Sequence, residues 1–169
     1  MKIDKETFLE ERVVFMEDDF NEESCNELKK QLLWLMTHAE ESPVTLYISS
    51  YGGGLYEFLQ IYGLLKKKKF PLTTIVTGKA MSAGAYLLMM GDTRMAYPGS
   101  RIMFHELSGS IFGKLNEQEI DLKESKELMK TLYGLLSEVE VDNIKEWLSK
   151  DQYLSVKEAL RMNILNKRL

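Results

Sequence analysis

Hydrophobic and polar positions follow two different periods along the chain, and these predict strands and helices in alternation. Short runs rich in β-branched and aromatic residues predict strands at residues 12–16, 44–49, 72–77, 93–96 and 101–104. Between and after these runs, apolar residues recur every three or four positions, as on the buried face of a helix. Strands that alternate with helices indicate an α/β domain with a largely parallel sheet covered by helices.

The first two helices are predicted from this spacing and from their flanking residues. Asn21 or Ser24 can cap the first helix, and its apolar positions are Cys25, Leu28, Leu32, Leu35 and Met36. The second helix follows the glycines at 52–54 and stops before Pro71. Its apolar positions are Leu55, Phe58, Leu59, Tyr62 and Leu65.

The second half of the chain is more charged. From about residue 116 to 148 the pattern predicts one long helix followed by another, with the candidate apolar positions Ile120, Leu128, Leu132, Leu135 and Leu136. Ser155 and Glu158 have the spacing of a capping box, which predicts the start of a final short helix.

Composition restricts the class of protein. The chain is 44% hydrophobic, which is enough to bury a full core, and its length favours one domain over residues 1–169. A net charge of −4 provides no basic field for nucleic acid. Cys25 is the single cysteine and cannot form an internal disulfide. The opening residues lack the apolar run of a secretory signal, and no apolar run approaches the ~20 residues of a membrane span. We therefore expect a cytoplasmic protein without nucleic acid or membrane partners.

The segment at residues 78–85, Gly-Lys-Ala-Met-Ser-Ala-Gly-Ala, is the strongest chemical signal. Ser82 stands among small residues where a strand pattern gives way to a helix pattern, and a helix start offers free N–H groups to an oxyanion. A second glycine loop, residues 50–54, also joins a strand to a helix. Sites in α/β folds gather at such strand ends, although residues 52–54 alone would also suit a plain tight turn.

A serine nucleophile needs a general base, and the chain has only two histidines, His38 and His105. His38 is predicted at the end of the first helix, on the surface. His105 ends an apolar strand and is the better candidate. The orienting acid stays open among 26 carboxylates, with several conceivable partners: Asp92, Glu106, Asp121, Asp142 and Asp151.

Residues 78–85 resemble the nucleophile motif of the ClpP peptidases, and residues 100–105, Ser-Arg-Ile-Met-Phe-His, resemble their histidine strand. Three further segments are similar to the family's opening strand, its Ser-Pro-Gly-Gly loop and its closing signature: residues 9–15, 50–53 and 150–159. The resemblance spans about residues 8–167, and the motifs occur in the family's order.

The resemblance implies a role for each matching residue. Ser82 would be the nucleophile, His105 the general base and Asp151 the acid that holds the imidazole, and the N–H groups of Gly53 and Ala83 would form the oxyanion hole. It implies no cofactor and no metal. The implied fold is the ClpP/crotonase-like α/β fold with a helical handle at approximately residues 110–148.

The same resemblance implies an assembly and partners. Heptameric rings of this homo-oligomer, stacked to a tetradecamer, would enclose a chamber. The chamber would admit unfolded polypeptides or short peptides, and an AAA+ unfoldase would be a possible partner.

Other hypotheses remain beside a serine endopeptidase. Tyr51, Ala83 and the pair Glu106-Leu107 depart from the family's motifs, and only about ten residues precede Arg12. A carboxylate beside His105 favours the protonated imidazole. These features suit a catalytically silent ring subunit. An acyl-CoA enzyme of the crotonase fold is a weaker alternative, and a cysteine enzyme based on Cys25 is the weakest.

Overall fold

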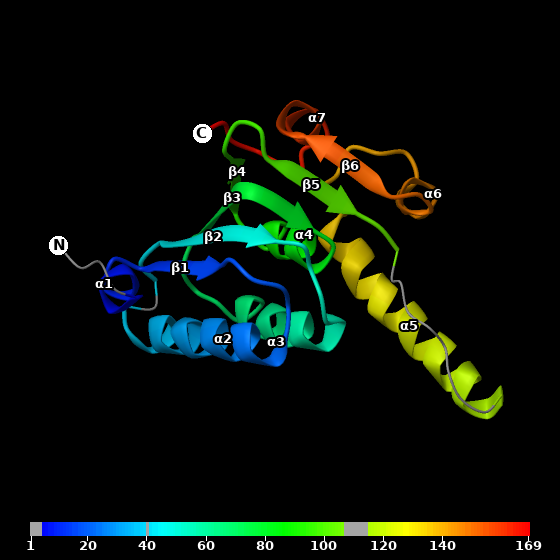
Figure 1. Ribbon diagram of the computed structural model, residues 1–169, viewed down its shortest axis with the longest axis horizontal. Helices are drawn as coiled ribbons and strands as arrows, with labels where there is room; N and C mark the ends of the chain where they lie inside the picture. The colour runs from blue at the N-terminus through cyan, green and yellow to red at the C-terminus, as the bar shows by residue number, and fades with distance from the viewer. Residues whose placement is uncertain (1–4, 40, 107–114) are drawn as a thin grey trace.

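The computed structural model of the chain describes residues 5–39, 41–106 and 115–169. In chain order the elements are α1 (Lys5–Glu10), β1 (Val13–Met16), α2 (Glu22–Thr37), β2 (Val44–Ser50), α3 (Leu55–Leu65), β3 (Leu72–Met81), α4 (Ala83–Leu88), β4 (Thr93–Ala96), β5 (Arg101–Phe104), α5 (Leu115–Leu135), α6 (Ile144–Leu148), β6 (Gln152–Ser155) and α7 (Val156–Arg161) (Figure 1). Leu107 and the first residues of the predicted handle lie outside the described residues.

The strands form one sheet in the order β1-β2-β3-β5-β6, and β4 pairs with β3 beside that path. Every pairing is parallel except that of β5 with β6. Helices α2 and α3 lie side by side along one face of the sheet, and α5 extends away from the body (Figure 1). The predicted α/β fold with a largely parallel sheet is confirmed.

The strand β3 is longer than its sequence pattern indicates. Residues 78–81 were expected to be part of a loop, but they continue β3 and pair with β5 from Lys79↔Arg101 to Met81↔Met103. That expectation was wrong because the pairing partner lies over 20 residues away, where local periodicity carries no information about it. The chain therefore turns only at Ser82.

Strands β4 and β5 both run alongside β3, one after the other. The register shifts by two residues between Val76↔Ala96 and Lys79↔Arg101. The buried Ser100 bridges this break, because its hydroxyl accepts from the Gly78 amide at 3.0 Å and donates to the Val76 carbonyl at 3.2 Å. The short β4 thus ends where β5 takes over its place beside β3.

The helix patterns are largely confirmed. Asn21 and Ser24 form a capping box at the start of α2, and Ser155 and Glu158 form another at the start of α7. The predicted apolar face of α2 is buried at Cys25, Leu28, Leu32 and Leu35. In α5, Leu132 and Leu136, one residue beyond the helix end, are buried, so the C-terminal end of this helix is attached to the core.

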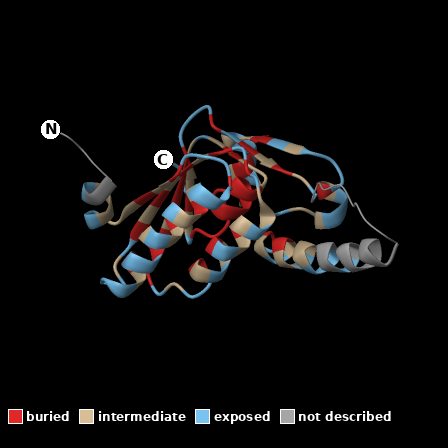
Figure 2. Ribbon diagram, turned by 60° about the horizontal axis from the view of Figure 1, so that its bottom comes forward, coloured by how far each residue is buried: buried red, intermediate tan, exposed pale blue. Residues whose placement is uncertain are grey.

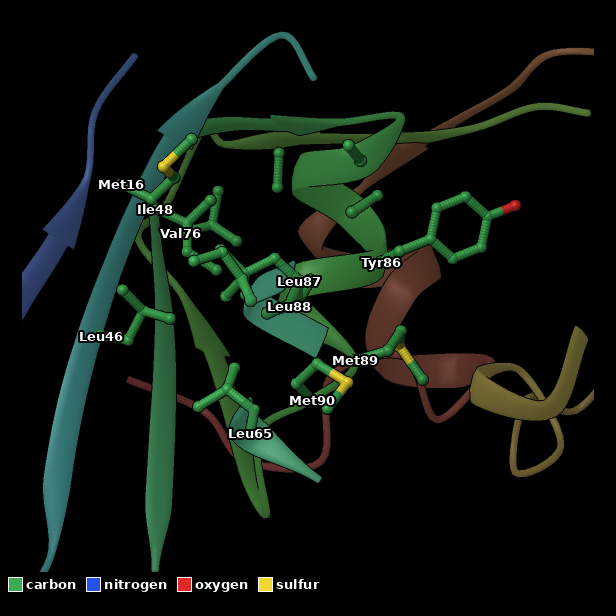
Figure 3. Close-up of a cluster of buried hydrophobic side chains, with 14 of the residues drawn as sticks. Met16, Leu46, Ile48, Leu65, Val76, Tyr86, Leu87, Leu88, Met89 and Met90 are labelled. Atoms are coloured by element: carbon green, nitrogen blue, oxygen red, sulfur yellow. The ribbon is translucent and has the colours of Figure 1, made fainter. Parts of the chain in front are cut away.

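The longest apolar run of the chain forms the centre of the core. Every residue of α4 is buried. Leu87 and Leu88 pack against strand residues that include Leu46, Ile48 and Val76, and buried residues concentrate around this helix (Figures 2 and 3). None of the helices in the described part of the chain has the length and hydropathy that crossing a bilayer would require.

Candidate active site

Ser82 occupies a sharp turn between β3 and α4. Its backbone has φ 53° and ψ −122°, a conformation that an L-residue adopts only under strain. The Ser82 amide donates to the Met103 carbonyl at 2.8 Å, and the Ser82 carbonyl accepts from the amides of Ala85 and Tyr86. Both sides of the turn are therefore anchored, and a strained strand-to-helix turn is a known way to expose a nucleophile.

His105 follows the last residue of β5, and its Nε2 lies 2.8 Å from the Ser82 hydroxyl oxygen. The parallel ladder between β3 and β5 produces this contact. Met81 pairs with Met103, Ser82 comes directly after Met81, and His105 lies two residues after Met103. The structure therefore brings together a serine and a histidine that are 23 residues apart.

Asp151 immediately precedes β6, the strand that pairs with β5. Strand β6 pairs antiparallel with β5, and Phe104 is opposite Gln152. His105 and Asp151 each stand one residue beyond this last pair, at the same end of the two strands. Asp151 is exposed, and no hydrogen bond within the described residues joins its carboxylate to His105.

The other candidate acids lie in different surroundings. Asp92 is at the amino end of β4 and is bound to Lys68, and Asp142 is exposed in the segment between α5 and α6. The side chain of Asp121 lies outside the described residues. Glu106 is exposed next to His105, and burial together with the Glu106 carboxylate raises the pKa of Tyr133 of α5.

The glycine loop packs directly against the serine turn. Gly52 has φ +104°, and a Cβ atom there would lie 2.6 Å from the Ser82 Cβ and 2.8 Å from the Met81 carbonyl oxygen. The loop is also tied to Phe20, whose amide donates to the Gly52 carbonyl and whose carbonyl accepts from the Gly54 amide. Only a residue without a side chain fits between the loop and Ser82.

Two backbone N–H groups at this junction remain free to bind a ligand. Neither the Gly53 amide nor the Ala83 amide has a hydrogen-bond acceptor in the described parts of the chain. Ala83 is the first residue of α4, where the N–H groups have no partner within the helix. Backbone N–H groups of this kind are the donors that an oxyanion hole uses.

The sequence interpretation missed two side chains that support this arrangement. The fully buried Ser50 accepts from the Gly52 amide at 3.0 Å and shapes the glycine loop. A serine two residues before a glycine is a recognised turn signal that points to it. Tyr86 donates its hydroxyl to the His105 carbonyl at 3.2 Å. No sequence signal identifies that contact.

The two remaining reactive residues lie outside the site. His38 caps the C-terminal end of α2, where its Nδ1 lies 2.9 Å from the Trp34 carbonyl oxygen and its ring stacks on the Trp34 indole. Cys25 is buried in the same helix, and burial raises the pKa of its thiol, which disfavours the reactive thiolate. Within the described residues, no cluster of three His, Cys, Asp or Glu side chains could hold a metal.

Comparison with known proteins relates nearly the whole chain to one family. A family model described as Clp protease matches residues 2–167. The chain is 33% identical over 164 residues to the ATP-dependent Clp protease proteolytic subunit 1 of Salinibacter ruber, which covers 94% of this chain and 70% of that protein. It is also 33% identical over 164 residues to the ATP-dependent Clp protease proteolytic subunit of Deinococcus radiodurans, covering 94% and 80%.

Proposed function

Because this chain belongs to the Clp protease family and is a serine-type endopeptidase, we propose that Ser82 is its nucleophile, His105 its general base and Asp151 the acid that orients the imidazole. The backbone amides of Gly53 and Ala83 form the oxyanion hole. The observation that carries this proposal is the 2.8 Å contact between the Ser82 hydroxyl and His105 Nε2, beside two free amides.

The proposed reaction follows from these positions. The Ser82 hydroxyl attacks the carbonyl of a peptide bond while its proton passes to His105 Nε2, and the two amides bind the tetrahedral oxyanion. The protonated imidazole then donates to the leaving amine, and an acyl-enzyme remains on Ser82. Water, deprotonated by His105, attacks this ester and releases the second product.

A fluorophosphonate probe tests the nucleophile directly, because it reacts with an activated serine without requiring a peptide substrate. We expect labelling of the wild type at Ser82 and none in Ser82→Ala. Ser137→Ala, which removes an exposed serine, is the matched control and should label normally. If wild-type Ser82 stays unlabelled and no peptide is cleaved in any assembled state, the assignment is wrong.

Asp151 requires a separate test, since its role rests on the register between β5 and β6. Asp151→Asn keeps the shape of the side chain but removes its charge. We expect peptide cleavage to fall by at least about 100-fold, as for other serine triads that lose their acid. Asp142→Asn changes another exposed aspartate of the same region and should leave the rate unchanged. Equal rates for the two variants would remove Asp151 from the triad.

We also propose that the subunits assemble into heptameric rings and that α5 is the handle through which two rings stack. In support, α5 joins the core through Leu132 near its C-terminal end, while its earlier turns extend away from the body (Figure 1). Native mass spectrometry should find seven or fourteen subunits. A stable monomer at high concentration would contradict this.

The relatives are named as proteolytic subunits of ATP-dependent proteases, so we propose that an AAA+ unfoldase feeds unfolded polypeptides to this chain in the cytoplasm. Short peptides should be cleaved by the subunit alone. A folded protein should be degraded only when an unfoldase and ATP are added, and degradation without them would argue against a closed chamber.

A catalytically silent ring subunit is the second candidate. The specific observation in its favour is that Asp151 makes no hydrogen bond to His105 within the described residues, while the family's Gln is replaced by Glu106 next to the imidazole. The probe experiment separates the two functions, because a silent subunit would assemble into rings yet leave Ser82 unlabelled.

A further inference from the structure

Tyr86 connects the helix of the proposed nucleophile to the strand end of the proposed base. It lies in α4, one helical turn after Ser82, and only 3% of its surface is exposed. Its ring points away from the cluster formed by Leu87 and Leu88 (Figure 3). The hydroxyl donates to the main-chain carbonyl of His105 at 3.2 Å.

The segment that begins at Ser82 therefore binds the histidine strand at two alternate carbonyls. The first bond runs from the Ser82 amide to the Met103 carbonyl, and the second runs from the Tyr86 hydroxyl to the His105 carbonyl. Carbonyls two residues apart on a strand point to the same side, so one helix start can reach both. The first bond fixes the nucleophile, and the second fixes the residue that carries the imidazole.

His105 requires such a tether because it stands just past its strand. The ladder with β3 ends at Met103, and the ladder with β6 ends at Phe104. Among the described residues, the Tyr86 hydroxyl is the one side-chain group that binds the His105 main chain. A backbone that drifts here would move Nε2 from Ser82, and displacements of about 1 Å can lower rates by about 100-fold.

We propose that the Tyr86 hydroxyl is a positioning group that holds His105 at hydrogen-bond distance from Ser82. This rests on the proposed roles of Ser82 and His105. Burial, with smaller contributions from Tyr133 and Glu106, raises the pKa of Tyr86 far above its usual value. The hydroxyl therefore keeps its proton, and remains a donor, throughout the range in which a peptidase works.

The ring of Tyr86 has a separate, structural role. It meets the Phe104 ring edge-on at a centroid distance of 5.4 Å and lies 6.3 Å from the Phe58 ring. Tyr86→Phe keeps both contacts and removes only the hydroxyl. Tyr62→Phe is a matched control, because within the described residues the Tyr62 hydroxyl makes no hydrogen bond while its ring also lies beside Phe58.

The experiment measures the rate at which a fluorophosphonate labels Ser82, together with kcat and KM for a short peptide and the thermal midpoint. For Tyr86→Phe we expect labelling and kcat to fall by about 3- to 10-fold, the range of one ordinary hydrogen bond, with KM unchanged. Tyr62→Phe should match the wild type. Labelling of Tyr86→Phe at the wild-type rate, whether or not its midpoint drops, would overturn the proposal.

A second variant covers the case in which Tyr86→Phe does not fold. Replacement of Tyr86 by 3-fluorotyrosine retains both the ring and the hydroxyl. Because the hydrogen bond to the His105 carbonyl is kept, this variant should label within about twofold of the wild-type rate. A loss of fivefold or more in this folded variant would contradict the proposal. Failure of the proposed function looks different, because then even the wild type would not label at Ser82.

Discussion

The polar groups near the two ends of β3 differ in whether they have hydrogen-bond partners. At its amino end, the Asp92 carboxylate accepts from Lys68 Nζ at 2.6 Å and from the Leu72 amide at 2.8 Å. The buried Arg94 guanidinium donates to the carbonyls of Gly91, Asn163 and Ile164. At the carboxyl end, the Gly53 and Ala83 amides have no acceptor in the described residues.

A positive φ occurs at both ends, but the surroundings differ. The carboxyl end contains Ser82 with φ 53° and the glycine loop with Gly52 at φ +104°. At the amino end Asn163 has φ 56°, but its carbonyl accepts from Arg94 and its side chain donates to the Glu138 carbonyl. A cavity of about 540 Å³ does open beside Asp92 and Arg94, yet both of these groups and the nearby Asn166 side chain already have hydrogen-bond partners. Paired groups stabilise the fold, whereas unpaired groups in a strained backbone are available to a ligand.

The largest effect is expected from adding a side-chain atom between the glycine loop and the turn at Ser82. Gly52→Ala adds a Cβ only 2.6 Å from the Ser82 Cβ and at an unfavourable φ, so we expect Ser82 labelling to fall by at least about 100-fold, comparable to the loss of an oxyanion donor. The free energy of unfolding should fall by about 1–3 kcal/mol from strain alone. Both are measured on the same preparation.

Gly63→Ala provides the matched control, because beyond its own helix backbone and chain neighbours no atom lies within 4 Å of the added Cβ on α3. This variant should be stabilised by about 0.5–1 kcal/mol and label normally. If Gly52→Ala labelled as fast as Gly63→Ala, the loop would have no part in the chemistry.

Two buried hydroxyl groups, one near each end of β3, test whether the two ends differ in function. Ser50→Ala leaves the Gly52 amide without its acceptor and should lower kcat/KM by about 10-fold, with a stability loss of about 1–3 kcal/mol. Thr74→Val removes a hydroxyl that donates to the Leu88 carbonyl, nearer the amino end. It should lose about 1 kcal/mol of stability and no activity. Equal activity losses would mean that the two ends do not differ in function.

The strain at Ser82 predicts a smaller effect on stability. A positive φ is disfavoured for alanine and permitted for glycine, so Ser82→Gly should be more stable than Ser82→Ala by about 1 kcal/mol, even though both are inactive. Chemical denaturation of the two variants at one protein concentration measures the difference. A less stable glycine variant would show that the turn is relaxed.

The smallest expected effect tests the amino end through pH. Partial burial by itself raises the pKa of Asp92, but the hydrogen bonds from Lys68 and the Leu72 amide outweigh it and hold that pKa below its usual value. A depressed folded-state pKa contributes stability that is present above the unfolded-state pKa and disappears as pH falls through the folded one. Asp92→Asn should therefore be less stable than wild type at neutral pH.

This difference between Asp92→Asn and wild type should vanish in acid, and peptide cleavage should be unaffected at neutral pH. Denaturation curves across the acid range measure the first, and kcat/KM measures the second. A stability difference that persists below the folded-state pKa would mean that the hydrogen bonds of Asp92 do not depend on its charge.

Some elements of the fold were visible in local patterns and others were not. The capping boxes at Asn21 and Ser155 and the apolar face of α2 were predicted, because each depends on residues a few positions apart. Strand β6, the helix α1 and the last four residues of β3 were missed. The strand segments exist because of pairing with distant residues, as in Met103↔Tyr153. Helix α1 has only six residues, too few to show a helical period.

The amino-acid sequence alone determined which residues are available for chemistry: one histidine at a strand end, a serine among small residues and one glycine-rich loop. Tertiary structure decided their distances. Parallel pairing of β3 with β5 brings His105 to Ser82. Antiparallel pairing of β5 with β6 brings the start of β6, next to Asp151, beside the end of β5, and Tyr86 reaches the same strand end from α4. The reason is physical, because ladder register and backbone strain arise from contacts between segments far apart in the chain, whereas periodicity and capping are local.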